Sequence, residues 1–250
     1  MPVHDFTRLS SDAFRGFHNA WLTRLYDALN AGAMPNGYYA MIESETGEVV
    51  PDLLALHAPA ADDKSADVPP GGGVAVATAP PPVAERREYR GAARTRTPRK
   101  YLAVRRADGG RLVGLVEVVS RANKDRPASV AQFVGKVVSA VEAGVHVLVI
   151  DLYPPTPSAP DGLPAEIGAE WGDEYRLNPA TPLTLASYVA DDPPVAYIQP
   201  LAVGDDLPDM PLFLDPGHYV NVPLAATYAE NVARFPAPLR RALEAMPEQT

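Results

Sequence analysis

The sequence of 250 residues contains no cysteine, which excludes disulfide bonds, thiolate zinc sites and thiol nucleophiles. It also lacks any apolar run near the roughly 20 residues that a helix needs to cross a bilayer. Its first residues, MPVHDFTRLSSD, contain no basic stretch followed by an apolar one, so we expect no secretory signal. Together these absences favour a cytoplasmic protein with no membrane partner.

The formal net charge of -9 argues against a protein that coats nucleic acid, because such binding depends on neutralising phosphates with Lys and Arg. The charge is uneven, however, and one segment is strongly basic. Its cationic residues are Arg86, Arg87, Arg90, Arg94, Arg96, Arg99, Lys100, Arg105 and Arg106. A strip of this kind is typical of a solvated loop, and it is also compatible with an anionic ligand.

Apolar residues at helical spacing predict three helices. The first follows the capping residues Ser10 and Ser11 and has one apolar face, formed by Phe14, Phe17, His18, Trp21, Leu22, Leu25 and Leu29. The second begins at Pro127, which suits a first helical position, and ends before Gly144. A third is expected over residues 223–235.

Extended segments of alternating or continuous apolar residues predict the strands. These cover residues 38–44, 49–57, 101–106, 112–120, 145–150, 183–189 and 196–200. The turn Asp108-Gly109-Gly110 makes a hairpin of the third and fourth segments. A helix joins the strand at 112–120 to the one at 145–150, so we expect these two strands to be parallel.

The organisation that follows is a single α/β domain with a mixed sheet flanked by helices. Residues 1–153 form its core. Within the core, residues from about 59 to 97 are rich in Pro and Gly in their first half, and we expect a disordered insertion there. Residues 154–250 are expected to be a proline-rich C-terminal extension that packs on the core.

Two carboxylates stand within apolar strands, Asp52 in VVPDLLAL and Glu117 in LVEVVSRANK. Burying an unpaired carboxylate costs several kcal/mol, so two on neighbouring strands are natural ligands for a hard divalent cation. The structural alternative is that each lies at a strand end in water or pairs with an arginine. Lys124 and Lys136 are near enough in sequence to assist at such a site, and the alternative for both is an ordinary solvated lysine.

Other polar residues have simpler interpretations. His18 and His146 lie on apolar segments and are expected to be hydrogen-bonded core histidines, and the alternative for His18 is a catalytic role near the metal. Ser120 and Asn123 are expected to shape the turn that leaves the strand. Asp151 closes the central strand and could touch the site.

Several segments carry a resemblance to a bacterial family of domains of unknown function, which covers nearly the whole chain. They are MPVHDFTR, FHNAW, LNAGAMPNGYYAM, PDLLAL, VEVVSRANKD, GVHVLVIDLYPPTP, YIQPLAVGDDLPDMPLFL and HYVNVPLAATY. The core of that family is similar to the PD-(D/E)XK, or restriction-endonuclease-like, superfamily. Pro51-Asp52 matches its PD element and Glu117 its second acidic residue. The lysine normally found two residues later is replaced by Val119, and the resemblance implies that Lys124 or Lys136 takes its place.

This resemblance implies a phosphodiesterase or nuclease that uses Mg²⁺ or Mn²⁺. Asp52 and Glu117 would hold the metal, one of the two lysines would assist, and the substrate would be DNA or another phosphodiester. The alternative is a catalytically inactive member of the fold that acts as a binding or assembly module, and a homo-oligomer is compatible with either. A hydrolase of small phosphate compounds would share the metal site but need a closed pocket. If the carboxylates of Asp52 and Glu117 converge within reach of one metal ion, an enzyme is favoured. If they diverge or are paired with arginines, a binding protein is favoured.

Overall fold

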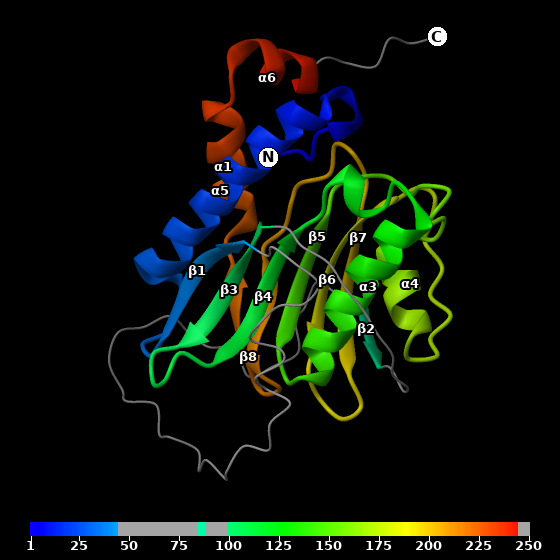
Figure 1. Cartoon of the computed structure of the whole chain (residues 1–250). Coiled ribbons are helices and arrows are strands. Elements are labelled where there is room, and N and C mark those ends of the chain that lie inside the picture. The colour runs from blue at the N-terminus through cyan, green and yellow to red at the C-terminus, as the bar shows by residue number, and fades with distance from the viewer. Residues whose placement is uncertain (45–84, 89–99, 245–250) are drawn as a thin grey trace.

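The computed structural model describes residues 1–44, 85–88 and 100–244 (Figure 1). They form a seven-stranded mixed sheet in the order β1-β3-β4-β5-β6-β7-β2, and a separate two-stranded sheet, β8-β9. The strands are β1 (Tyr38–Ser44), β2 (Glu85–Glu88), β3 (Lys100–Arg106), β4 (Leu112–Val118), β5 (His146–Asp151), β6 (Leu183–Val189), β7 (Val195–Leu201), β8 (Met210–Asp215) and β9 (His218–Val222). The helices are α1 (Ser11–Ala28), α3 (Pro127–Glu142), α4 (Gly162–Ala169), α5 (Leu224–Arg234) and α6 (Ala237–Glu244), with short turns η1 (Phe6–Arg8), η2 (Leu29–Ala33) and η3 (Arg121–Asn123).

The large sheet is buried on both faces, which explains why its central strands read as continuous apolar runs. Side chains alternate along β4, so Val116 joins the core beneath α1 and α5, while Leu115 joins the core beneath α3 and α4. β4 and β5 are parallel, as predicted, with Val116 opposite Leu148. β8 packs against β4, β5 and β6 on the α1 face.

Local sequence accounts for the helix and turn boundaries near the site. Ser10 caps α1 by accepting a hydrogen bond from the backbone N–H of Ala13 at 3.2 Å. At the other end, the Asn30 side chain bonds both backbone groups of Ala40, which ties the exit of α1 to β1. Gly144, with φ of 80°, ends α3 in the left-handed conformation that glycine tolerates.

The predicted mixed α/β sheet with flanking helices is confirmed, and most predicted elements match those observed. The first helix, the hairpin at 101–120, the helix from Pro127 and the strands at 145–150, 183–189 and 196–200 correspond to α1, β3–β4, α3, β5, β6 and β7. The predicted strand at 49–57 lies outside the described residues.

The structure differs from the predictions in the segment expected to be a disordered insertion. Most of residues 59–97 lie outside the described residues, but Glu85–Glu88 form β2, which pairs antiparallel with β7 from Glu85–Ile198 to Glu88–Val195. Strand pairing uses backbone groups, so even the charged sequence ERRE can extend a sheet edge.

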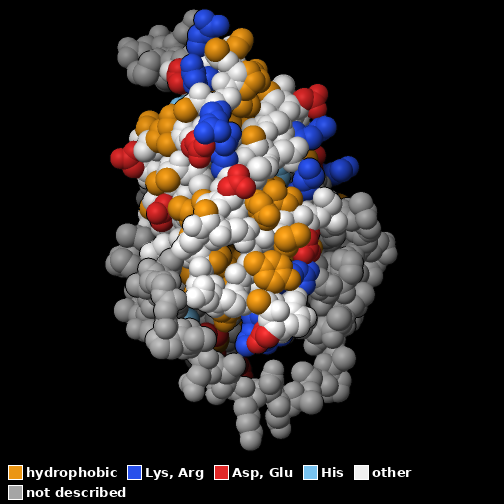
Figure 2. All heavy atoms as spheres, turned by 90° about the vertical axis from the view of Figure 1, so that its left-hand side faces the viewer, with side chains coloured by type: hydrophobic (Ala, Val, Ile, Leu, Met, Phe, Trp, Pro, Cys, Tyr) orange, Lys and Arg blue, Asp and Glu red, His pale blue; other side chains and the backbone are white. Residues whose placement is uncertain are grey.

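The C-terminal region also differs from an extension that only covers the core. Residues 154–250 supply β6 and β7 to the main sheet, and Leu183, Leu185 and Leu201 belong to its buried core. The hairpin β8–β9 and helix α4 were not predicted. Within the described residues, no helix is long and apolar enough to cross a membrane. On the side where β1 lies, charged side chains of both signs are interspersed with apolar ones (Figure 2).

Candidate functional site

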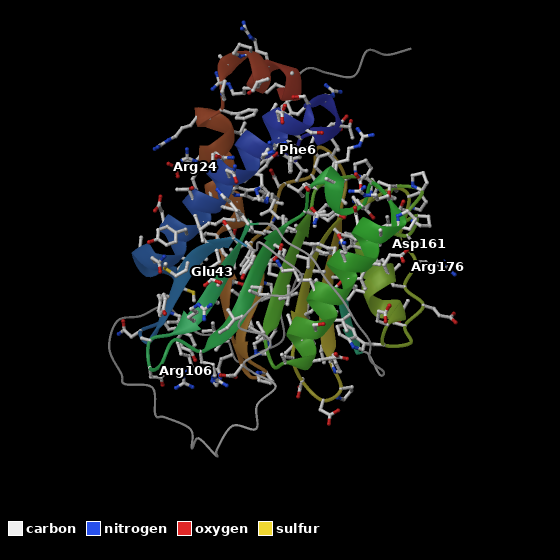
Figure 3. The ribbon with its side chains drawn as sticks, in the orientation of Figure 1. Phe6, Arg24, Glu43, Arg106, Asp161 and Arg176 are labelled. Carbon is white, nitrogen blue, oxygen red and sulfur yellow. The ribbon has the colours of Figure 1, made fainter. Side chains whose placement is uncertain are left out.

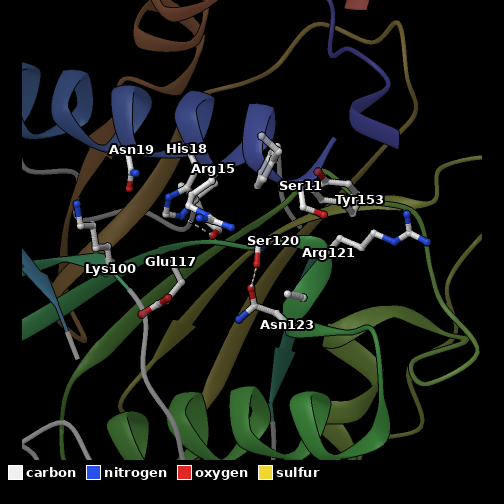
Figure 4. Close-up of a pocket in the computed structure, with 13 residues that line it drawn as sticks. Ser11, Arg15, His18, Asn19, Lys100, Glu117, Ser120, Arg121, Asn123 and Tyr153 are labelled. Atoms are coloured by element: carbon white, nitrogen blue, oxygen red, sulfur yellow. Dashed lines mark hydrogen bonds between the residues drawn. The ribbon is translucent and has the colours of Figure 1, made fainter. Parts of the chain in front are cut away.

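A pocket of ≈ 400 Å³ lies between α1 and the segment that leaves β4. Its lining includes Arg15 and His18 from α1, Lys100 at the start of β3, Glu117 on β4, Arg121 in η3 and Tyr153 after β5. Figure 4 shows Glu117 in the space between α1 and α3. The parallel strands β4 and β5 end on this side, and ligands of α/β sheets commonly bind beside the carboxyl ends of such strands.

Glu117 is buried, and its Oε1 lies 2.6 Å from the Nζ of Lys136 on α3. Side-chain alternation places Glu117 on the same face of β4 as Leu115 and Val119, toward α3. A buried carboxylate needs such a partner, because isolating it from water is costly. Two alternatives from the sequence are therefore wrong: Glu117 is not in water at a strand end, and Lys136 is not solvated.

Lys124, the other candidate lysine, is buried in a second ion pair. Its Nζ lies 2.6 Å from Oδ2 of Asp151 and donates a 2.6 Å hydrogen bond to the carbonyl oxygen of Tyr153. Burial raises the pKa of Asp151, and the Lys124 ammonium acts in the opposite direction. Lys124 therefore ties the segment after β4 to the end of β5, and the expectation of a solvated lysine is wrong here too.

Cationic side chains outnumber acidic ones in the pocket lining. Arg15, Lys100 and Arg121 come from three different elements, and Glu117 supplies the lining's carboxylate. Arg15 is well exposed and forms an ion pair with Asp12 at 2.9 Å. Figure 4 shows Arg15 and His18 projecting from α1 beside Ser120, with Lys100 and Arg121 on opposite sides of the pocket. This charge distribution favours an anionic ligand.

The two polar turn residues and His146 behave as predicted, whereas His18 is hydrogen-bonded as predicted but lies at the pocket and not in the core. Asn123 Oδ1 accepts hydrogen bonds from both the backbone N–H of Ser120, at 2.8 Å, and its hydroxyl, at 2.6 Å. His18 is half-buried, and its Nε2 donates to the carbonyl oxygen of Val118 at 3.0 Å. His146 is buried and accepts a 3.0 Å hydrogen bond from the backbone N–H of Ala190.

Asp52, the predicted partner of Glu117, lies outside the described residues, as do Arg90, Arg94, Arg96 and Arg99 of the basic strip. The two arginines at its end are engaged by acidic neighbours. Arg105 pairs with Glu43 at 2.8 Å, and Arg106 donates to Asp108 from Nε at 2.9 Å. Arg106 holds the pKa of the exposed Asp108 below its usual value. These two side chains therefore contribute to local structure on β3.

The described part of the chain does not supply a full set of ligands for a metal ion. Glu117 offers carboxylate oxygens, the ligand type that Mg²⁺ and Mn²⁺ prefer. However, residues 1–44, 85–88 and 100–244 contain no group of three or more His, Asp or Glu side chains placed to hold an ion. A metal at Glu117 therefore needs further ligands from the substrate, from water or from a residue such as Asp52.

Sequence reasoning missed Arg15 and Asn19 as pocket residues of α1. Arg15 and Asn19 are four residues apart and flank His18, so they share one side of the helix, next to its apolar stripe. That spacing was visible in the sequence, but nothing local indicated that β4 would end beneath it. Comparisons with protein-family models, with curated proteins and with solved structures find no match for this chain.

Proposed function

We propose that this chain is a metal-dependent phosphodiesterase with a restriction-endonuclease-like core, and that the pocket beneath α1 is its active site. The observation that carries the proposal is the 2.6 Å contact of Lys136 Nζ with Glu117, a residue of the pocket lining. Val119 occupies the position where the resemblance would place a lysine. Lys136 reaches the same carboxylate from α3, which is how a relocated lysine would act.

The arrangement of the core supports this proposal. Leaving out β2, the described chain has a helix, a strand, a hairpin, a second helix and a further strand in the order α1, β1, β3–β4, α3 and β5. β1, β3, β4 and β5 are neighbours in the sheet, with β4 parallel to β5. This is compatible with the restriction-endonuclease-like fold, although a fold by itself establishes no activity.

In the proposed site, Glu117 and Asp52 would hold Mg²⁺ or Mn²⁺, and Lys124 would serve the structure through Asp151. The bound metal would supply an activated water and offset negative charge on the phosphate. Arg15, Lys100 and Arg121 would attract the phosphate oxygens of DNA or of a smaller phosphodiester. Lys136 would orient the Glu117 carboxylate and add positive charge beside it.

The test is hydrolysis of bis(p-nitrophenyl) phosphate and of single- and double-stranded DNA with Mn²⁺, together with calorimetry of Mn²⁺ binding. We expect Glu117→Gln to lower the hydrolysis rate by about 100-fold or more, because removing one charged group from such a site costs about 10²–10³. Asp52→Asn should have a similar effect. The control is Glu170→Gln, which changes an exposed carboxylate beyond α4 and should have no effect.

Equal rates for Glu117→Gln and wild type would contradict the proposed site. So would the absence both of hydrolysis on all three substrates and of Mn²⁺ binding at millimolar concentration.

The second candidate is a binding module without hydrolysis, and one observation favours it. The Glu117 carboxylate is held at 2.6 Å by an ammonium, an arrangement that neutralises it without a metal. This candidate predicts that the chain binds phosphate or a short oligonucleotide, that Arg15 and Lys100 contribute to the affinity, and that binding is the same with Mn²⁺ and with EDTA. The phosphodiesterase predicts turnover that EDTA abolishes.

A further inference from the structure

The Lys136 ammonium lies near two groups that differ in kind. It contacts Oε1 of Glu117 at 2.6 Å, and it lies over the ring of Tyr101, whose centroid is 4.0 Å from Nζ. All three residues are buried. A cation over an aromatic ring is stabilised by the negative face of the ring, and the effect is larger when water is excluded.

Tyr101 is itself held by Glu43, which lies on the edge strand β1. Its hydroxyl donates to Oε2 of Glu43 at 3.1 Å, and Oε1 of Glu43 accepts from Nε of Arg105 at 2.9 Å. Glu43 and Tyr101 are directly opposite each other in the β1–β3 ladder. Figure 3 shows Glu43 in the region of β1 and β3. A continuous series of contacts thus runs from Arg105 through Glu43, Tyr101 and Lys136 to Glu117.

We propose that Tyr101 is a positioning residue for Lys136. Its ring fixes the ammonium against Glu117, and the Glu43–Arg105 ion pair fixes the ring. A lysine side chain has four flexible carbons, so a contact at Nζ alone does not fix the conformation of the carbons that lead to it. The ring limits the conformations that the lysine can adopt and stabilises its positive charge. The face of the ring has no oxygen that would compete with Glu117 for a metal or a proton. The catalytic consequence rests on the proposed function, whereas the positioning itself does not.

A ring-current shift provides a direct test of the geometry. In wild type, the ε-methylene protons of Lys136 should be shifted upfield in the NMR spectrum, because they lie close to the face of Tyr101. The signal is assigned by its loss in Lys136→Met. Tyr101→Phe keeps the ring but loses the hydrogen bond to Glu43, so it should keep most of the shift, and Tyr101→Leu should abolish it. The control Tyr197→Leu removes another buried tyrosine, one stacked on Phe213, and should leave the Lys136 signal unchanged.

Steady-state kinetics on the same variants tests the consequence. Tyr101→Leu should lower kcat by about 10- to 100-fold with little change in KM, because misplacing a reacting group by about 1 Å costs up to 10²-fold. Tyr101→Phe should restore most of the rate, which a loss of general stability alone would not explain.

The outcomes are separable. An unshifted Lys136 signal in wild type, or an upfield signal that persists in Tyr101→Leu, overturns the positioning role. The wild-type spectrum decides this even if Tyr101→Leu fails to fold. A wild type without hydrolysis defeats the proposed function and leaves the spectral test intact. Normal kcat in a folded Tyr101→Leu overturns the catalytic consequence.

Discussion

Two buried lysine–carboxylate pairs lie near the same end of the sheet, Lys124–Asp151 and Lys136–Glu117. Both have an Nζ–oxygen distance of 2.6 Å, and in both each side chain is at most 5% exposed. They differ in what surrounds them. The first is enclosed by backbone hydrogen bonds, whereas the second includes a carboxylate that lines a pocket.

The Lys124–Asp151 pair satisfies its groups internally. Lys124 Nζ also donates to the Tyr153 carbonyl, Asp151 Oδ1 accepts from the Tyr153 backbone N–H at 3.1 Å, and the Thr156 hydroxyl donates to the Lys124 carbonyl at 2.6 Å. These contacts fix the segments after β4 and β5 to each other. The pair therefore maintains the pocket wall, because Asn123 and Tyr153, next to its contacts, line that pocket.

The Lys136–Glu117 pair has the same chemistry in a different setting. Its ammonium rests on an aromatic ring and its carboxylate faces a pocket rich in cations. The comparison teaches that distance and burial do not separate a structural ion pair from one proposed to be functional. Access to a ligand does, and three measurements can break or sharpen that distinction.

The largest effect is expected for Lys124→Met, which leaves Asp151 buried without its cation. Removing one partner of a buried ion pair costs about 3–5 kcal/mol, and we expect a loss of that size in the free energy of unfolding measured with urea. Lys136→Met is the matched control. It should cost less, about 1–3 kcal/mol, since Glu117 can gain water or a proton through the pocket. Equal costs for the two variants would contradict the comparison.

The next effect concerns His146, a buried titratable group bonded to a backbone amide instead of an ion. Burial lowers its pKa to about 4 from an ordinary 6.5. Below pH 6.5 His146 is protonated in the unfolded chain but stays neutral in the folded chain. This histidine therefore reduces the free energy of unfolding as the pH falls from 6.5 to 4. The total is about 3 kcal/mol, at 1.36 kcal/mol per pKa unit.

Urea denaturation at several pH values checks this expectation. His146→Gln should show a shallower loss of stability between pH 6.5 and 4 than wild type. His218→Gln, which removes an exposed histidine on β9, is the control and should keep a slope close to wild type. Parallel slopes for wild type and His146→Gln would show that burial of this ring does not govern the acid side of the stability curve.

The smallest effect is expected at the pocket mouth. Lys100→Ala should weaken the binding of inorganic phosphate by about 2- to 5-fold, the size of one exposed charge contact, and change stability by less than about 0.5 kcal/mol. The difference should diminish at high salt. Arg176→Ala is the control, because Arg176 is exposed and pairs with Asp161 near α4 (Figure 3). Equal weakening by both variants would indicate attraction to the overall charge and not to the pocket.

Much of the fold could be predicted because its signals are local. Ser10 and the apolar stripe define α1, Pro127 and Gly144 bound α3, and the glycine turn at 109–110 defines the β3–β4 hairpin. The hairpin β8–β9 was missed although an apolar run, residues 210–214, leads into Asp215, Pro216 and Gly217, a turn sequence that could have revealed it. β2 could not be predicted, because its charged residues carry no apolar pattern.

For the candidate site, the sequence by itself determined which residues were unusual: a carboxylate at position 117 within an apolar strand, and lysines at 124 and 136 near it. Only the tertiary structure decided which lysine meets which carboxylate. The reason is physical, since in both pairs the lysine and the carboxylate lie on different elements far apart in the sequence, and only packing brings them together. The packing of α3 on β4 brings Lys136 to Glu117, while the segment after β4 directs Lys124 to Asp151.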